Sequence, residues 1–195
     1  MRRILFACAA VVPALVAGCT PAAQPTPSAT PVPTAAAPTL QLMCTPEEGG
    51  TASPCTQAEY DAMVARDKLY DEAKALLAKY NQEFERLARS GEPASKTLLS
   101  LTGGGYTEQT RAQLSQGITF EGGSFETLWT KRAFEEPKEG STLTLLACTD
   151  LTSVTLKKGD ETLGSGRRAY QWTYFAPTPE GLKIVAAENQ AVESC

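Results

Sequence analysis

The sequence predicts an α+β domain in which N-terminal helices pack on an antiparallel sheet. Residues 57–90 repeat apolar side chains at three- and four-residue spacings, which is typical of a long amphipathic helix. From about residue 118 the period changes to two, and β-branched and aromatic residues recur in runs separated by turn residues. Helices followed by successive strands indicate helices gathered against an antiparallel sheet.

The long helix has defined ends in the sequence. Thr56-Gln57-Ala58-Glu59 is a capping box, so the helix should begin directly after Cys55. Ser90-Gly91 with Pro93 behind it marks the end. Its apolar stripe needs a partner, which we expect to be the sheet, and consists of Tyr60, Met63, Val64, Ala73, Leu76, Leu77, Tyr80, Phe84 and Leu87.

Two short helices and a series of strands follow the long helix. The helices are predicted at 94–101 and, with Thr107 as the cap, at 107–115. Runs of β-forming residues between glycine, proline and aspartate turns predict the strands. These strands are expected at residues 118–121, 124–136, 142–149, 153–157, 167–176 and 182–189.

Aromatic side chains gather in the predicted strands. Tyr170, Trp172 and Tyr174 alternate along one strand and therefore share one face of it. Together with Trp129 and Tyr106 they have two interpretations. They either line an apolar pocket or pack as core against the long helix.

The first residues have the layout of an export signal. Arg2 and Arg3 precede an apolar run from Ile4 to Val16, and small residues then lead to Cys19. The apolar run is too short for a comfortable membrane span. The chain is therefore predicted to be exported.

Val16-Ala17-Gly18-Cys19 resembles the lipobox of bacterial lipoproteins. The resemblance implies cleavage before Cys19, a lipid on its thiol, and anchoring at the outer face of a bacterial cell membrane. Residues 1–18 would then be the signal peptide. A tether rich in proline, alanine and threonine would follow at 19–41, and the folded domain would occupy 42–195.

Charge and composition exclude several classes of function. Loss of residues 1–18 removes Arg2 and Arg3 but no acidic residue, so the net charge changes from −4 to −6. An acidic domain does not suit a nucleic-acid partner. The sequence contains no histidine, which excludes Ser-His-Asp and Cys-His catalysis. No cofactor is predicted.

The cysteines predict two disulfides. Cys8 leaves with the signal and Cys19 is the lipid site, so an even number remains in an oxidising compartment: Cys44, Cys55, Cys148 and Cys195. Of the three pairings, we favour Cys44–Cys55 with Cys148–Cys195, because the first closes a short loop rich in turn residues. Four thiolates also suit zinc, but no C-x-x-C spacing is present, so no metal is predicted.

Three helices followed by long strands resemble the NTF2-like (SnoaL-like) fold. Leu145-Leu146-Ala147-Cys148-Thr149-Asp150 is similar to the Leu-x-x-Cys-x-Asp strand end of tethered actinobacterial lipoproteins with this fold. The segment 179–185 is similar to their closing strand, with Leu182 where tryptophan is usual. The resemblance covers 57–195 and implies a cone in which a strongly bent antiparallel sheet wraps the first helix and encloses a pocket. The fold serves isomerases, hydratases, binding proteins and assembly modules alike.

Two hypotheses for function follow. The first is a non-catalytic, membrane-tethered module that binds an apolar small ligand or an envelope protein. The alternative is an envelope enzyme of isomerase or hydratase type that uses Asp150 and a pocket tyrosine as an acid–base pair. Asp150 can instead be a turn residue whose carboxylate accepts backbone N–H bonds. If Asp150 lies on the floor of the pocket, the enzyme hypothesis is favoured. If it lies outside the pocket, the turn role is favoured.

Overall fold

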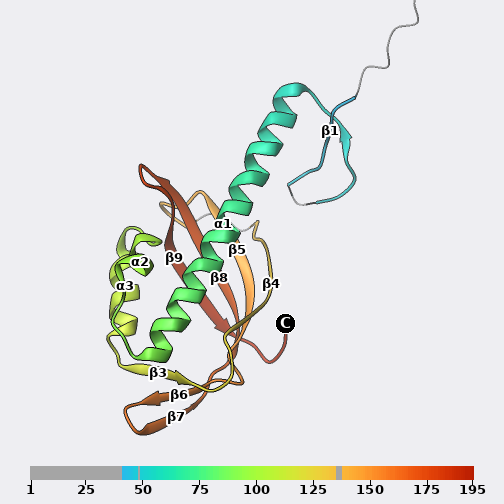
Figure 1. Cartoon of the computed structure of the whole chain (residues 1–195). Helices are drawn as coiled ribbons and strands as arrows, with labels where there is room; N and C mark the ends of the chain where they lie inside the picture. Colours follow the sequence, from blue (N-terminus) through green and yellow to red (C-terminus); the bar gives the residue numbers. More distant parts are fainter. Residues whose placement is uncertain (1–40, 48, 135–137) are drawn as a thin grey trace, which may run out of the picture. The chain divides into compact units, whose positions relative to one another are not determined.

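The computed structural model describes residues 41–47, 49–134 and 138–195 (Figure 1). The predicted signal peptide, the lipid site Cys19 and the tether up to residue 40 lie outside these ranges. None of the helices within them combines the length and hydrophobicity that a membrane span requires.

The long helix α1 (Gln57–Ser90) has the predicted ends. The Thr56 hydroxyl accepts a hydrogen bond from the Glu59 N–H at 3.3 Å, and the Glu59 carboxylate accepts one from the Thr56 N–H at 2.8 Å. Both arms of the capping box therefore satisfy backbone groups that the first helical turn leaves free. Gly91 ends the helix in the left-handed conformation with φ 69°.

A small hairpin that the sequence did not predict precedes α1. Strands β1 (Met43–Cys44) and β2 (Ser53–Pro54) pair antiparallel, and a disulfide joins Cys44 to Cys55 with a Cα–Cα distance of 5.7 Å. The hairpin lies beside the first turns of α1, beyond the end of the sheets (Figure 1). The apolar stripe is consequently not covered along its whole length, and Val64 stays 47% exposed.

The remaining strands form two antiparallel sheets. A four-stranded sheet has the order β4-β5-β8-β9, and a three-stranded sheet has the order β3-β6-β7. The bounds are β3 (Ile118–Glu121), β4 (Glu126–Arg132), β5 (Leu143–Asp150), β6 (Thr155–Lys158), β7 (Glu161–Ser165), β8 (Arg168–Thr178) and β9 (Gly181–Ala191). The predicted α+β class, with helices on antiparallel strands, is confirmed. The sequence did not show that the strands divide between two sheets.

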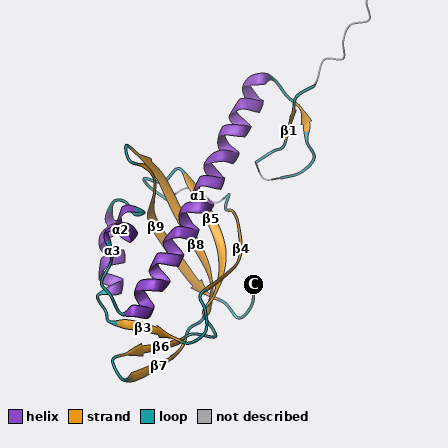
Figure 2. Ribbon diagram, in the orientation of Figure 1, coloured by secondary structure: helices purple, strands orange, loops and turns teal. Residues whose placement is uncertain are grey.

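The core lies between α1 and one face of the four-stranded sheet, with which α1 makes contact along β5 and β9 (Figure 2). We call this face the inner face. It is formed by Leu145, Ala147, Gln171, Thr173 and Phe175, which alternate along β5 and β8 with the residues of the outer face. The helix contributes buried side chains such as Tyr80 and Leu87 to the same core.

Glycines at residues 103–105 connect α2 (Lys96–Ser100) to α3 (Gly105–Leu114), and the first of them contacts β9. The Gly103 N–H donates to the Ile184 carbonyl at 2.8 Å, and a Cβ on Gly103 would lie 3.2 Å from that of Lys183. The predicted cap Thr107 is wrong, because α3 already begins at Gly105. The Thr107 hydroxyl instead accepts a hydrogen bond from that of Thr102 at 3.0 Å.

Gly123 sits where a side chain has no room. A Cβ there would lie 2.2 Å from the Ser153 carbonyl oxygen, and its φ of +50° is left-handed. Gly122 has a similar φ of +63° but open space around it. We expect Gly122→Ala to cost about 1–2 kcal/mol of unfolding free energy for the backbone alone, and Gly123→Ala to cost clearly more. Urea unfolding of the two variants measures the difference, and equal losses would contradict the close approach.

Candidate functional site: an uncharged cavity

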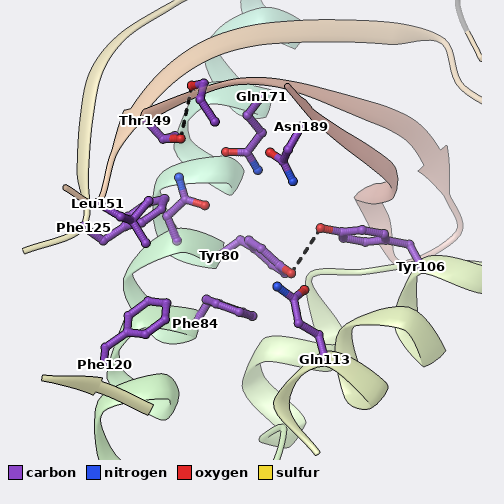
Figure 3. Close-up of a pocket in the computed structure, with 12 residues that line it drawn as sticks. Tyr80, Phe84, Tyr106, Gln113, Phe120, Phe125, Thr149, Leu151, Gln171 and Asn189 are labelled. Atoms are coloured by element: carbon purple, nitrogen blue, oxygen red, sulfur yellow. Dashed lines mark hydrogen bonds between the residues drawn. The ribbon is translucent and has the colours of Figure 1, made fainter. Parts of the chain in front are cut away.

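A cavity of about 190 Å³ lies between α1, α3 and the inner face of the four-stranded sheet (Figure 3). We call it the inner cavity. Every side chain that lines it is uncharged, and most are carboxamides, phenols or phenyl rings. The lining consists of Tyr80, Asn81, Phe84, Tyr106, Gln113, Phe120, Phe125, Thr149, Leu151, Ala169, Gln171 and Asn189.

Two tyrosines from different helices meet at the cavity. The hydroxyls of Tyr80 on α1 and Tyr106 on α3 lie 3.2 Å apart, and the Thr110 hydroxyl lies 3.3 Å from that of Tyr80. Burial raises the pKa of both phenols above their ordinary value. Both tyrosines are therefore neutral at physiological pH and act as hydrogen-bonding groups rather than as bases.

Gln171 is the most unusual member of the lining. It lies on β8, is only 8% exposed, and points its amide into the space shared with Tyr80 and Asn189 (Figure 3). Within the described ranges no hydrogen bond joins this amide to another residue, whereas the neighbouring Asn81 donates to the Thr127 hydroxyl at 3.4 Å. The amide is not one of the fully enclosed polar groups without a partner, which among the described residues are the hydroxyls of Thr144 and Thr173 and the indole N–H of Trp172. The polar atoms of Gln171 therefore face the open space of the cavity, where water or a ligand can bond to them.

The aromatic residues predicted to line a pocket lie in two different places in the structure. Tyr106 lines the inner cavity, but Trp129, Tyr170, Trp172 and Tyr174 do not. They lie on the outer face of the sheet, where the Trp129 and Tyr170 rings are 5.8 Å apart and the Tyr170 and Trp172 rings 6.1 Å apart. These four pocket assignments were wrong, and so was the alternative that the β8 aromatics pack on the long helix.

The reason for this error is physical. Alternation shows which residues of a strand share a face, but it does not show which face meets the helix. In β8 the more apolar set turned outward, and the polar set with Gln171 and Thr173 turned inward.

The second disulfide lies on the outer face as well. Cys148, which is fully buried on β5, is bonded to Cys195 with a Cα–Cα distance of 6.2 Å. The structure thus contains the two cysteine pairs that were favoured from the sequence. Among the described residues no group of three His, Cys, Asp or Glu side chains is placed to hold a metal ion.

Asp150 lies outside the cavity, at the end of β5. Its carboxylate accepts hydrogen bonds from the N–H and hydroxyl of Thr152 at 2.8 and 2.6 Å, and it forms an ion pair with Arg168. These bonds lower the pKa of Asp150 to about 2, with the Thr152 bonds as the largest cause and Arg168 next. This geometry is that of the turn alternative for Asp150, and it gives no support to the catalytic one, since the carboxylate stabilises a turn outside the cavity.

Asp150→Asn tests this role, because asparagine can keep the turn bonds while losing the charge. The native pKa of about 2 lies below the ~3.9 of an unfolded aspartate, so the carboxylate adds stability above about pH 4 and this stability is lost as pH falls toward 2. We expect the variant to be less stable than the parent at pH 7 and equal to it near pH 2. Asp160→Asn, at the exposed β6–β7 turn, is the control. A loss of stability that persists unchanged at pH 2 would contradict the ion-pair account.

Sequence reasoning missed most of the cavity. Tyr80 was assigned to the apolar stripe of the helix, and Gln171 was not singled out. A signal was present, because Asn81 follows Tyr80 on the buried side of α1, and Gln171 stands between two aromatic residues in a strand. A polar residue at a position that the hydrophobic periodicity predicts to be buried is a signal of such a site.

Comparisons with known proteins give the following similarities. The chain is similar to an NTF2-like protein with a cystatin-like fold from Novosphingobium aromaticivorans, at 19% identity over 72% of this chain and 92% of that one, with a TM-score of 0.37. It is also similar to the intermembrane-space region of the chloroplast protein ARC6, at 9% identity over 63% and 96%, with a TM-score of 0.38. No family model and no curated protein matches the sequence.

Proposed function

We propose that the chain is a lipid-anchored extracytoplasmic lipoprotein whose domain binds an uncharged small molecule in the inner cavity, without catalysis. The observation that carries the binding function is an uncharged cavity into which the Gln171 amide points, with its polar atoms open to that space. The ligand would complete this amide's hydrogen bonds.

The chemistry of the lining favours a neutral ligand with both polar and apolar surface. Carboxamides and phenols donate and accept hydrogen bonds, while Phe84, Phe120 and Phe125 supply apolar walls. A charged ligand would lose its hydration there with no opposite charge in the lining, which is costly.

The same lining disfavours the isomerase or hydratase alternative. General acid–base catalysis near neutral pH needs a group that exchanges protons in that range. The raised pKa values of Tyr80 and Tyr106 oppose this role, and Asp150 is engaged with Thr152 and Arg168 outside the cavity.

The anchoring part of the proposal rests on the sequence around Cys19. The export signal, the lipobox-like residues and the proline-rich segment support it. Two disulfides in the domain are compatible with an oxidising compartment outside the cytoplasm.

The test of binding is native mass spectrometry of the full chain recovered from bacterial membranes. We expect a bound, electrically neutral molecule that is released on denaturation. Asn189→Phe, at the edge of the cavity, should prevent its retention, whereas Gln190→Phe, the next residue and on the opposite face of β9, should not. Bare protein in every preparation, or equal retention by the two variants, would refute binding in this cavity.

A further inference from the structure

A second pocket adjoins the inner cavity. It has a volume of about 440 Å³ and shares four wall residues with the cavity, namely Phe84, Gln113, Phe120 and Leu151. We call it the apolar pocket, because five of its nine other wall residues are aliphatic: Ala88, Leu114, Ile118, Leu156 and Leu163. The other four are Gln116, Ser165, Gly166 and Arg167.

A row of four aromatic rings leads from the inner cavity to the apolar pocket (Figure 3). The ring centres of Tyr106 and Tyr80 are 6.0 Å apart, those of Tyr80 and Phe84 6.0 Å, and those of Phe84 and Phe120 6.4 Å. The row begins with two hydroxyl-bearing rings at the polar end and finishes with two plain phenyl rings that line both spaces. The lining thus changes from polar to apolar along one continuous wall.

We propose that the inner cavity and the apolar pocket form one elongated site for an uncharged amphiphile with a single hydrocarbon chain. This inference rests on the proposed function and names the class of ligand. The polar head of the ligand lies at Gln171 and the two tyrosines. Its hydrocarbon chain passes Phe84 and Phe120 into the apolar pocket.

The sizes of the two spaces support one shared occupant. Small-molecule sites usually measure about 300–1,000 Å³, and the inner cavity alone is smaller than this. The apolar pocket, at about 440 Å³, lies within the range by itself, so a ligand of ordinary size that reaches the inner cavity extends into the apolar pocket.

The orientation follows from where polar groups are buried. The Gln171 amide and the hydroxyls of Tyr80 and Tyr106 all lie at the inner cavity, so the polar head belongs there. In the apolar pocket, by contrast, two residues that do not line the inner cavity are exposed, namely Leu163 at 46% and Arg167. The chain therefore ends toward solvent, which leaves this end of the site open to ligand entry.

Binding of 1-monoacylglycerols tests the inference, because their head is uncharged and their chain length can be varied. Calorimetry on the full Cys19→Ala chain needs no detergent. We expect affinity to rise about fourfold per added methylene from acetyl to decanoyl glycerol, until the apolar pocket is filled. Decanoate, with the same chain but a charged head, should bind more weakly than decanoyl glycerol.

Two matched variants test where the hydrocarbon chain of the ligand lies. Leu163→Gln should lower the affinity for decanoyl glycerol by about fivefold and leave acetyl glycerol unaffected, because it removes part of the apolar wall. Leu128→Gln is the control, since Leu128 is 47% exposed on β4 and lines neither space.

The outcomes separate this inference from the proposed function. Equal affinity at all hydrocarbon chain lengths would overturn the proposal of an amphiphilic ligand. The proposal of a small neutral ligand in the inner cavity would then remain. Failure of every monoacylglycerol to bind would also overturn it, and native mass spectrometry would then decide the proposed function independently.

Discussion

Cys19→Ala is expected to move the protein from the membrane fraction to the soluble extracytoplasmic fraction. A protein-linked diacylglycerol with a further acyl chain supplies enough buried methylene groups for stable anchoring, at about 0.8 kcal/mol each. Without the thiol there is no site for this lipid. The substitution places alanine two residues after Ala17, which gives the A-x-A pattern of an ordinary cleavage site, so export and cleavage remain open to the variant.

Cys8→Ala is the matched control for this experiment. Cys8 lies in the apolar run of the predicted signal, so its replacement should leave the protein membrane-bound. Fractionation with immunodetection, together with the mass of the N-terminal peptide, measures both effects. If Cys19→Ala remains in the membrane fraction after cleavage, the anchor lies elsewhere in the chain and the lipoprotein proposal fails.

The features that were predicted best from the sequence are those with local causes. The capping box at Thr56 and Glu59 and the left-handed end at Gly91 depend on residues a few positions apart, and α1 has the predicted ends. The short separation of Cys44 and Cys55 likewise favoured a local bridge, and pairing the remaining two cysteines followed from it.

Features set by tertiary packing were predicted less well. The residues at 124–136 were expected to be one strand, but β4 ends at Arg132. The third helix begins at Gly105, because its approach to β9 is fixed by close contact of Gly103 with Lys183. Neither the division into two sheets nor the hairpin of β1 and β2 has a periodic signature, since each depends on distant partners.

The candidate site was predicted least well, because its defining residues break the patterns used to read a sequence. Hydrophobic alternation favours aromatic residues as pocket lining, yet in β8 they face outward and Gln171 faces α1. A binding site is often the place where local preference yields to function. In the proposed function, the polar side chains that the inner face turns toward the cavity are the ones that a ligand would contact.

Gln171→Met should separate stability from function. Methionine has a similar length but no hydrogen-bonding amide, so the variant replaces a largely buried polar side chain with an apolar one. A gain of about 1 kcal/mol would raise Tm by about 2–4 °C for a domain of this size. Loss of the hydrogen bonds to the ligand should weaken binding of decanoyl glycerol about tenfold, measured on the same ligand-free preparation.

Gln190→Met is the control, because Gln190 is exposed on the outer face of β9, opposite Tyr170. It should change neither Tm nor ligand affinity. A fall in Tm for Gln171→Met would mean that the amide stabilises the ligand-free fold, and the argument that it is kept for a ligand would fail. A rise in Tm together with weaker binding is the signature of a residue kept for its ligand at the expense of stability.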